Sequence, residues 1–152
     1  MLFTRKTMLM LLVCLCTYAG ATAQQPTEVK PKLFASYPST LSISESCLQN
    51  IFSLAQDQEA NIDFGNNLVF PCKVLRNELK YSNMQTVIIR SSIFDNAMLQ
   101  VSRVVNRDQS ITYNGRIINE RAADGFQIKK TAAGTYQLQK FETDRVLEGC
   151  FL

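Results

Sequence analysis

Histidine and tryptophan are both absent from this chain of 152 residues, and its six glycines are scattered along the sequence. The lack of histidine excludes the Ser-His-Asp and Cys-His nucleophile systems in their usual forms, together with histidine-based zinc sites. The glycines form no phosphate-binding loop, and no acidic segment has the spacing of a calcium-binding loop. The sequence therefore predicts a protein without a metal, a cofactor or enzymatic activity. A hydrolase built on a pair of carboxylates is the enzymatic alternative.

Long apolar runs are also lacking, apart from one within the first 23 residues. Arg5 and Lys6 precede an apolar run over residues 8–16, and Ala21-Thr22-Ala23 then offers a small-x-small cleavage site. This order is typical of a secretory signal peptide, and a retained or lipid-modified anchor is the alternative. The run is shorter than the about 20 residues that span a bilayer. We expect residues 1–23 to be a signal peptide and the protein to be secreted or periplasmic, with no stable membrane insertion after cleavage.

Acidic and basic side chains nearly balance once residues 1–23 are removed. The full chain has 16 Lys and Arg against 13 Asp and Glu. Cleavage removes Arg5 and Lys6 and no acidic residue, which leaves 14 basic and 13 acidic side chains and a net charge of +1. Nucleic acid is therefore not an expected partner.

Three cysteines stay in the exported part of the chain: Cys47, Cys72 and Cys150. An oxidising compartment favours one disulfide among them, and three pairings are possible. Cys72 shares a strand face with Phe70 and Val74, which predicts that its thiol is buried. Cys47 and Cys150 are the expected pair, because their bond would tie the end of the chain to the predicted helix.

The segment after the signal peptide is polar and contains three prolines before residue 41. This composition predicts a flexible lead over residues 24–40, within which a short edge strand at Leu33–Ala35 is an option. Residues 41–152 are then expected to form a single domain.

One helix is predicted near the start of the domain. Ser42 or Ser44 can cap it, with Glu45 in the first turn. An apolar stripe follows at helical spacing, made of Leu48, Ile51, Phe52 and Ala55. The helix is expected to end near residues 58–61, where alternation takes over.

The rest of the chain has the patterns of β-strands. Apolar and polar residues alternate near residues 68–75, 98–105, 111–117, 126–128 and 136–140, and residues 86–91 contain a β-branched run. Pro71 points to an edge or a bulge in the first of these. Asn114-Gly115 predicts a hairpin, with a single bulged strand as the alternative. Turns are also expected at residues 78–83, Asp95-Asn96, residues 106–109, Asp124-Gly125 and Ala133-Gly134.

This pattern predicts an α+β fold, with one N-terminal helix packed on a curved antiparallel β-meander of about six strands. A small β-barrel or sandwich with a helix is the alternative. A helix followed by such a meander resembles the cystatin-type folds in architecture, but the chain carries no matching inhibitory motif.

Two groups of side chains are weak candidates for binding. Arg116, Arg121, Lys129 and Lys130 make a local basic segment, although strand alternation alone would place such charges on a wet face. Tyr113 and Tyr136 are of a residue type enriched at interfaces, although core or cross-strand packing is the favoured explanation for them.

The leading functional hypothesis is a non-enzymatic exported domain that binds another protein or a small ligand. An inhibitor of an exported protease is one alternative, with residues 77–83 or 119–124 as candidate loops. A structural or assembly component of the cell envelope is another. A ligand binder should have an apolar cavity in the sheet, an inhibitor a protruding loop, and an assembly protein an unpaired strand edge.

Overall fold

The computed structural model describes residues 30–143 and contains one helix and one antiparallel sheet of eight strands. The signal peptide, the first part of the lead and Cys150 lie outside the described residues. The elements, in chain order, are β1 (Thr40–Ile43), α2 (Glu45–Ser53), β2 (Glu59–Asp63), β3 (Val69–Tyr81), β4 (Met84–Ser91), β5 (Met98–Val105), β6 (Ile111–Ile118), β7 (Asp124–Lys130) and β8 (Tyr136–Glu142).

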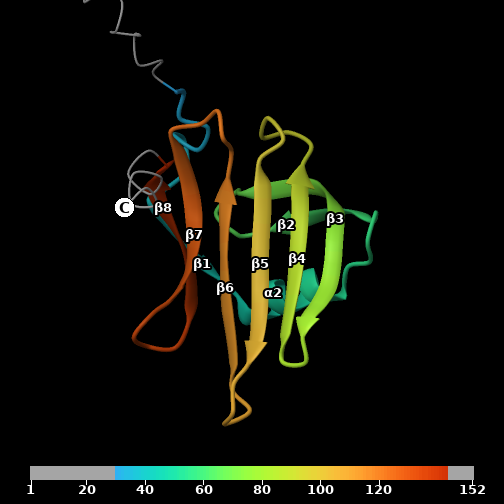
Figure 1. Ribbon diagram of the computed structural model, residues 1–152. Helices are drawn as coiled ribbons and strands as arrows, with labels where there is room; N and C mark the ends of the chain where they lie inside the picture. Colours follow the sequence, from blue (N-terminus) through green and yellow to red (C-terminus); the bar gives the residue numbers. More distant parts are fainter. Residues whose placement is uncertain (1–29, 144–152) are drawn as a thin grey trace, which may run out of the picture.

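The sheet is a meander from β2 to β8, and β1 is added beyond β8 at its far edge. β1 and β2 are therefore the two edge strands, although only α2 and its flanking turns separate them in the chain. α2 lies on the concave side of the curled sheet, as Figure 1 shows. The predicted α+β fold, a helix on a curved antiparallel meander, is confirmed, with eight strands rather than about six.

α2 forms where the sequence predicts it. Ser44 is its N-cap and accepts a hydrogen bond from the Cys47 N–H at 3.1 Å. Leu48, Ile51 and Phe52 are buried and form the stripe that packs on the sheet. The helix ends earlier than expected, at Ser53, because side chains of the sheet donate hydrogen bonds to the carbonyl groups at its end. The Asn77 amide donates to the carbonyls of Phe52 and Leu54, at 3.1 and 2.7 Å.

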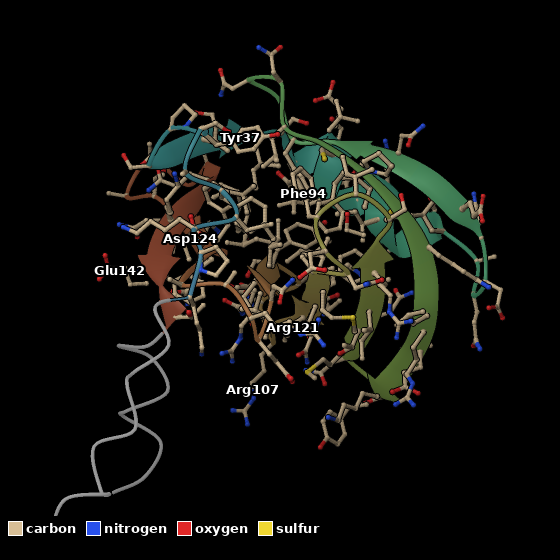
Figure 2. All side chains as sticks on the ribbon, turned by 90° about the horizontal axis from the view of Figure 1, so that it is seen from above. Tyr37, Phe94, Arg107, Arg121, Asp124 and Glu142 are labelled. Atoms are coloured by element: carbon tan, nitrogen blue, oxygen red, sulfur yellow. The ribbon has the colours of Figure 1, made fainter. Side chains whose placement is uncertain are left out.

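Apolar side chains, most of them aromatic or branched, fill the hollow of the sheet. Phe34, Phe64, Phe70 and Phe126 are almost completely buried there. Phe70 stacks on Phe94 with ring centroids 5.6 Å apart. Figure 2 looks along the strands and shows the sheet curving around a cluster of side chains, with Phe94 inside and Arg107 and Arg121 outside. The concave face is therefore a packed core.

The later part of the predicted lead packs against this core. Leu33–Tyr37 is a turn, so the prediction of a strand at Leu33–Ala35 is wrong. Phe34 is fully buried, with its ring 5.2 Å from the ring of Phe126. The Asp124 carboxylate accepts the N–H groups of Leu33 and Phe34, the shortest at 2.7 Å.

The other end of this turn is held by Lys140. Its ammonium group donates to the carbonyls of Phe34 and Tyr37, both at 2.6 Å. A negative group at the N–H end and a positive group at the carbonyl end match the dipole of a helical turn. Two side chains far apart in the sequence, Asp124 and Lys140, thus fix the approach to β1.

Two of the predicted turns lie within strands instead. Asn114-Gly115 is part of the continuous strand β6, so the predicted hairpin is wrong and the single-strand alternative is right, without a bulge in its pairing with β5. Asp124-Gly125 begins β7. A Cβ atom on Gly115 would lie 2.6 Å from the Gln100 carbonyl oxygen, and one on Gly125 would lie 2.5 Å from the Ile117 carbonyl oxygen. Both glycines allow close approach of neighbouring strands rather than chain reversal.

The other predicted turns are present, although one of them is shorter than expected. Asp95 and Asn96 both have positive φ, at 45° and 60°, and reverse the chain as expected. The turns near residues 106–109 and at Gly134 are also present. The predicted turn over residues 78–83 is shorter, because β3 extends to Tyr81. Pro71 lies in β3 just beyond the last residue paired with β4, where its missing N–H removes only one ladder bond.

Candidate functional site

Tyr113 and Tyr136 lie in the core. They are 1% and 4% exposed, and their rings meet edge to face with centroids 5.4 Å apart. The Tyr136 hydroxyl accepts the Tyr113 N–H at 3.2 Å. Burial raises the pKa of the Tyr113 phenol above its ordinary value, and the charge of Glu45 adds to this. These positions offer no tyrosine to a partner on the surface.

The four basic residues singled out in the sequence do not form one patch. Arg116 and Lys129 are exposed on the convex face of the sheet. Lys130 is on the opposite face, with its ammonium group 5.8 Å from the centre of the Tyr136 ring. Arg121 lies in the connection from β6 to β7. The fold therefore divides the basic segment between two faces and a loop.

Both cysteines in the described part of the chain are free thiols. Cys47 is half-buried, and its thiol donates to the Asp63 carbonyl at 3.3 Å. Cys72 is buried in β3, as predicted, and its thiol donates to the Ala60 carbonyl at 3.3 Å. The pairing of Cys47 with Cys150 stays a prediction, because Cys150 lies outside the described residues.

The buried Cys72 thiol predicts a loss of stability at high pH. Desolvation raises its pKa from 9.0 to about 11. As the pH rises from about 9 to 11, the unfolded chain loses this proton before the folded chain does, so the free energy of unfolding should fall across that window. Urea unfolding at pH 8 and pH 10.5 should show a larger fall for the native chain than for Cys72→Ala. Equal falls would mean that Cys72 titrates as if exposed.

The hydrogen-bond ladder between β2 and β3 shows which backbone groups of β2 face the free edge of the sheet. At one end, the Val74 N–H donates to the Gln58 carbonyl at 2.9 Å, and at the other the Phe64 N–H donates to the Leu68 carbonyl at 3.0 Å. In an antiparallel pair, residues that exchange hydrogen bonds recur at every second position. The even-numbered residues of β2 therefore turn their backbone groups towards β3.

The odd-numbered residues of β2, Glu59, Asn61 and Asp63, consequently turn their backbone groups to the free edge. The Asp63 carbonyl is taken by the Cys47 thiol. In the described part of the chain, no group bonds the outward N–H and carbonyl of Glu59 or Asn61. Two residues thus present open backbone donors and acceptors, which is the arrangement that an added strand requires.

A groove of about 340 Å³ runs along this edge, between β2 and α2. Its helix wall is formed by residues that include Cys47, Asn50, Ile51 and Leu54, and its other wall by Ala60–Asp63. The side chains of Glu59, Asn61 and Asp63 are exposed on the outer face of β2. The Asp63 charge adds to burial in raising the pKa of the Cys47 thiol, so the groove lies in the field of that carboxylate.

The opposite edge of the sheet is shorter and partly occupied. The Lys140 N–H donates to the Ser39 carbonyl, so Thr40 and Ser42 turn their backbone groups outward from β1. The loop after β2 lies beside this edge, since a Cβ atom on Gly65 would be 3.8 Å from the Ser42 carbonyl oxygen. The free edge of β2 is therefore the more accessible of the two.

Sequence reasoning did not find the groove at β2. The predicted helix extends to residues 58–61, and no strand is predicted between the helix and residue 68. A signal was present in Glu59-Ala60-Asn61-Ile62-Asp63, where polar and apolar residues alternate. That alternation predicts a strand, but it does not tell an edge strand from a central one.

Comparison of the chain with family models, with curated proteins and with solved structures finds no match. Across residues 30–143, no helix has the length and apolarity needed to cross a bilayer. Within the same range, no three Cys, Asp or Glu side chains come together as a set of metal ligands.

Proposed function

We propose that this protein is a non-enzymatic exported domain that binds a protein partner and accepts an extended segment of that partner as an added strand at β2. The observation that carries the proposal is the free edge of β2. Glu59 and Asn61 offer open backbone groups there, beside a groove of about 340 Å³ along α2. Strand addition takes its affinity from such main-chain bonds and its specificity from pockets for alternate side chains.

Other features of the molecule favour a protein partner over a small ligand. The hollow of the sheet, which could have held a small ligand, is filled by Phe34, Phe70, Phe126 and their neighbours. The role of an assembly component agrees with the same edge, because such components commonly pair strands between chains. Export is supported by the signal-like pattern of residues 1–23.

Inhibition of a protease is the second candidate function, and the hairpin between β3 and β4 favours it. Leu79 and Tyr81 are 72% and 61% exposed near its tip. The other predicted loop, residues 119–124, is less suited because Asn119 and Asp124 are buried. An inhibitor would present the hairpin to the protease, whereas strand addition would leave it free.

Asn61→Pro should weaken capture of the partner at least tenfold without unfolding the domain. The Asn61 N–H points to the free edge, so proline there removes a bond to the partner but none to β3. We expect at least a tenfold loss, since one net hydrogen bond and the fit of the added strand are both affected. The measurement is affinity capture from the envelope and medium of the producing cells, quantified by mass spectrometry.

Asn61→Ala is the matched control, because it removes the side chain and keeps the backbone N–H. It should capture the partner as the native chain does, and circular dichroism should be the same for all three proteins. Capture that survives Asn61→Pro would contradict strand addition at β2. If that capture were then lost in Leu79→Ser, the hairpin would be the binding element and the inhibitor function would replace the proposal.

A further inference from the structure

We propose that the segment accepted at β2 alternates basic side chains with small apolar ones, the basic ones lying on the outer face of the sheet and the apolar ones entering the groove. This inference rests on the proposed function and specifies the chemistry of its partner. It follows from what lies on each side of the free edge.

The outer face of β2 itself is acidic, although Lys73 of β3 lies directly opposite Glu59. Glu59 and Asp63 lie two positions on either side of Asn61 and are exposed on the same face. The third acidic residue nearby, Asp57, is paired with Lys73 at 3.1 Å. Glu59 forms no ion pair with another residue of the described chain, and the Asp63 carboxylate accepts only the Gly65 N–H, at 2.8 Å. Two carboxylates therefore stand ready for cations on an adjoining strand.

The inner side of the edge is a groove with both polar and apolar lining, in which Ser44, Ser46 and Asn50 stand beside the apolar side chains. Ile51 and Leu54 of α2 line it, together with Ala60 and Ile62 of β2. Side chains of an added strand alternate between the two faces, so every second one would enter this groove. The volume of about 340 Å³ is shared by the side chains that enter along the strand, which favours small apolar side chains over aromatic ones.

A second copy of the chain fits this edge poorly. Antiparallel pairing of two β2 strands about Asn61 would place Glu59 of each copy opposite Asp63 of the other. Like charges directly opposite one another destabilise a strand pair. The acidic edge thus discourages self-association, which is a common use of charge on edge strands, and it still admits a basic segment.

The test is selection from a displayed library of random nine-residue peptides, with the exported protein as the target. Four forms are compared: the native chain, Asn61→Pro, a charge variant and a charge control. The charge variant combines Glu59→Lys with Asp63→Asn, in which the asparagine oxygen can still accept the Gly65 N–H. The charge control combines Glu120→Lys with Glu78→Gln, which changes the net charge equally at exposed positions outside the groove.

The native chain and the charge control should enrich peptides with Lys or Arg at alternate positions, and the charge variant should enrich Asp or Glu there. Binding of a native-selected peptide should fall about tenfold in the charge variant, the sum of two cross-strand charge pairs. The native chain could instead enrich peptides that have no charge pattern and that Asn61→Pro does not enrich. That result would overturn this inference and leave strand addition standing. Failure to enrich any peptide, or enrichment unaffected by Asn61→Pro, would overturn both.

Discussion

Phe34→Ala should lower the free energy of unfolding by about 3–5 kcal/mol, the usual cost of removing a buried phenylalanine side chain. The ring is fully buried and lies 5.3 Å from the ring of Phe94 and 5.2 Å from that of Phe126. Its removal leaves a cavity between Phe126 of β7 and Phe94 of the loop between β4 and β5, which the packed core around it cannot close. Urea unfolding should show a lower midpoint with an unchanged slope.

Ser36→Ala is the matched control for this change. Ser36 belongs to the same turn and is exposed, so its replacement should alter stability by less than about 0.5 kcal/mol. A loss below about 1 kcal/mol for Phe34→Ala would mean that residues 33–37 contribute little to the core. The expected loss is a large share of the about 5–15 kcal/mol that stabilises a typical domain.

Asp124→Ala should destabilise the domain by about 2–4 kcal/mol, because it leaves two N–H groups of the turn without their acceptor. The carboxylate is 1% exposed and accepts the Leu33 and Phe34 N–H groups at 2.7 to 3.2 Å. Lys140, at the other end of the turn, would lose its complementary charge as well. Thermal and urea unfolding both measure the loss.

Asp124→Asn separates hydrogen bonding from charge, since the amide oxygen still accepts one N–H, and its loss should be about half as large. Phe34→Ala and Asp124→Ala act on the same turn, so the double variant should lose less than the sum of the two single losses. Full additivity would contradict the view that Asp124 acts by holding Phe34 in place.

The turn at residues 33–37 also bears on the proposed binding edge. It fixes the approach to β1, and β1 leads directly through Ser44 into α2. α2 forms one wall of the groove beside β2. A loosened turn should therefore weaken binding at β2 as well as stability, through the position of the helix.

Local patterns in the sequence determined much of this fold. The Ser44 cap and the stripe of Leu48, Ile51 and Phe52 define α2, because helix ends and faces depend on residues close together in the chain. A β-branched run defined β4, and alternation of apolar and polar residues defined β5. Asp95-Asn96 defined the turn between them, since these residues adopt positive φ readily.

Where a local turn signal conflicted with contacts between residues far apart in the sequence, those long-range contacts determined the structure. Asn114-Gly115 is a strong hairpin signal, but β6 pairs with β5 on one side and β7 on the other, and Gly115 serves close contact with Gln100. Asp124-Gly125 resembles a turn, but its carboxylate is bound to residues 33 and 34, about 90 positions away. No short stretch of the sequence contains both the carboxylate and the N–H groups that it binds.

The sequence by itself thus determined the helix, most of the strands, the burial of Cys72 and the lack of histidine chemistry. Only the tertiary structure decided that Phe34 belongs to the core and that Tyr113 and Tyr136 are internal. It also decided that the four basic residues of the predicted basic segment lie on two faces of the sheet and in a loop. It alone also made β2 an edge strand. A strand becomes an edge when no other segment pairs with its second side, and that is a property of the whole sheet rather than of residues 59–63.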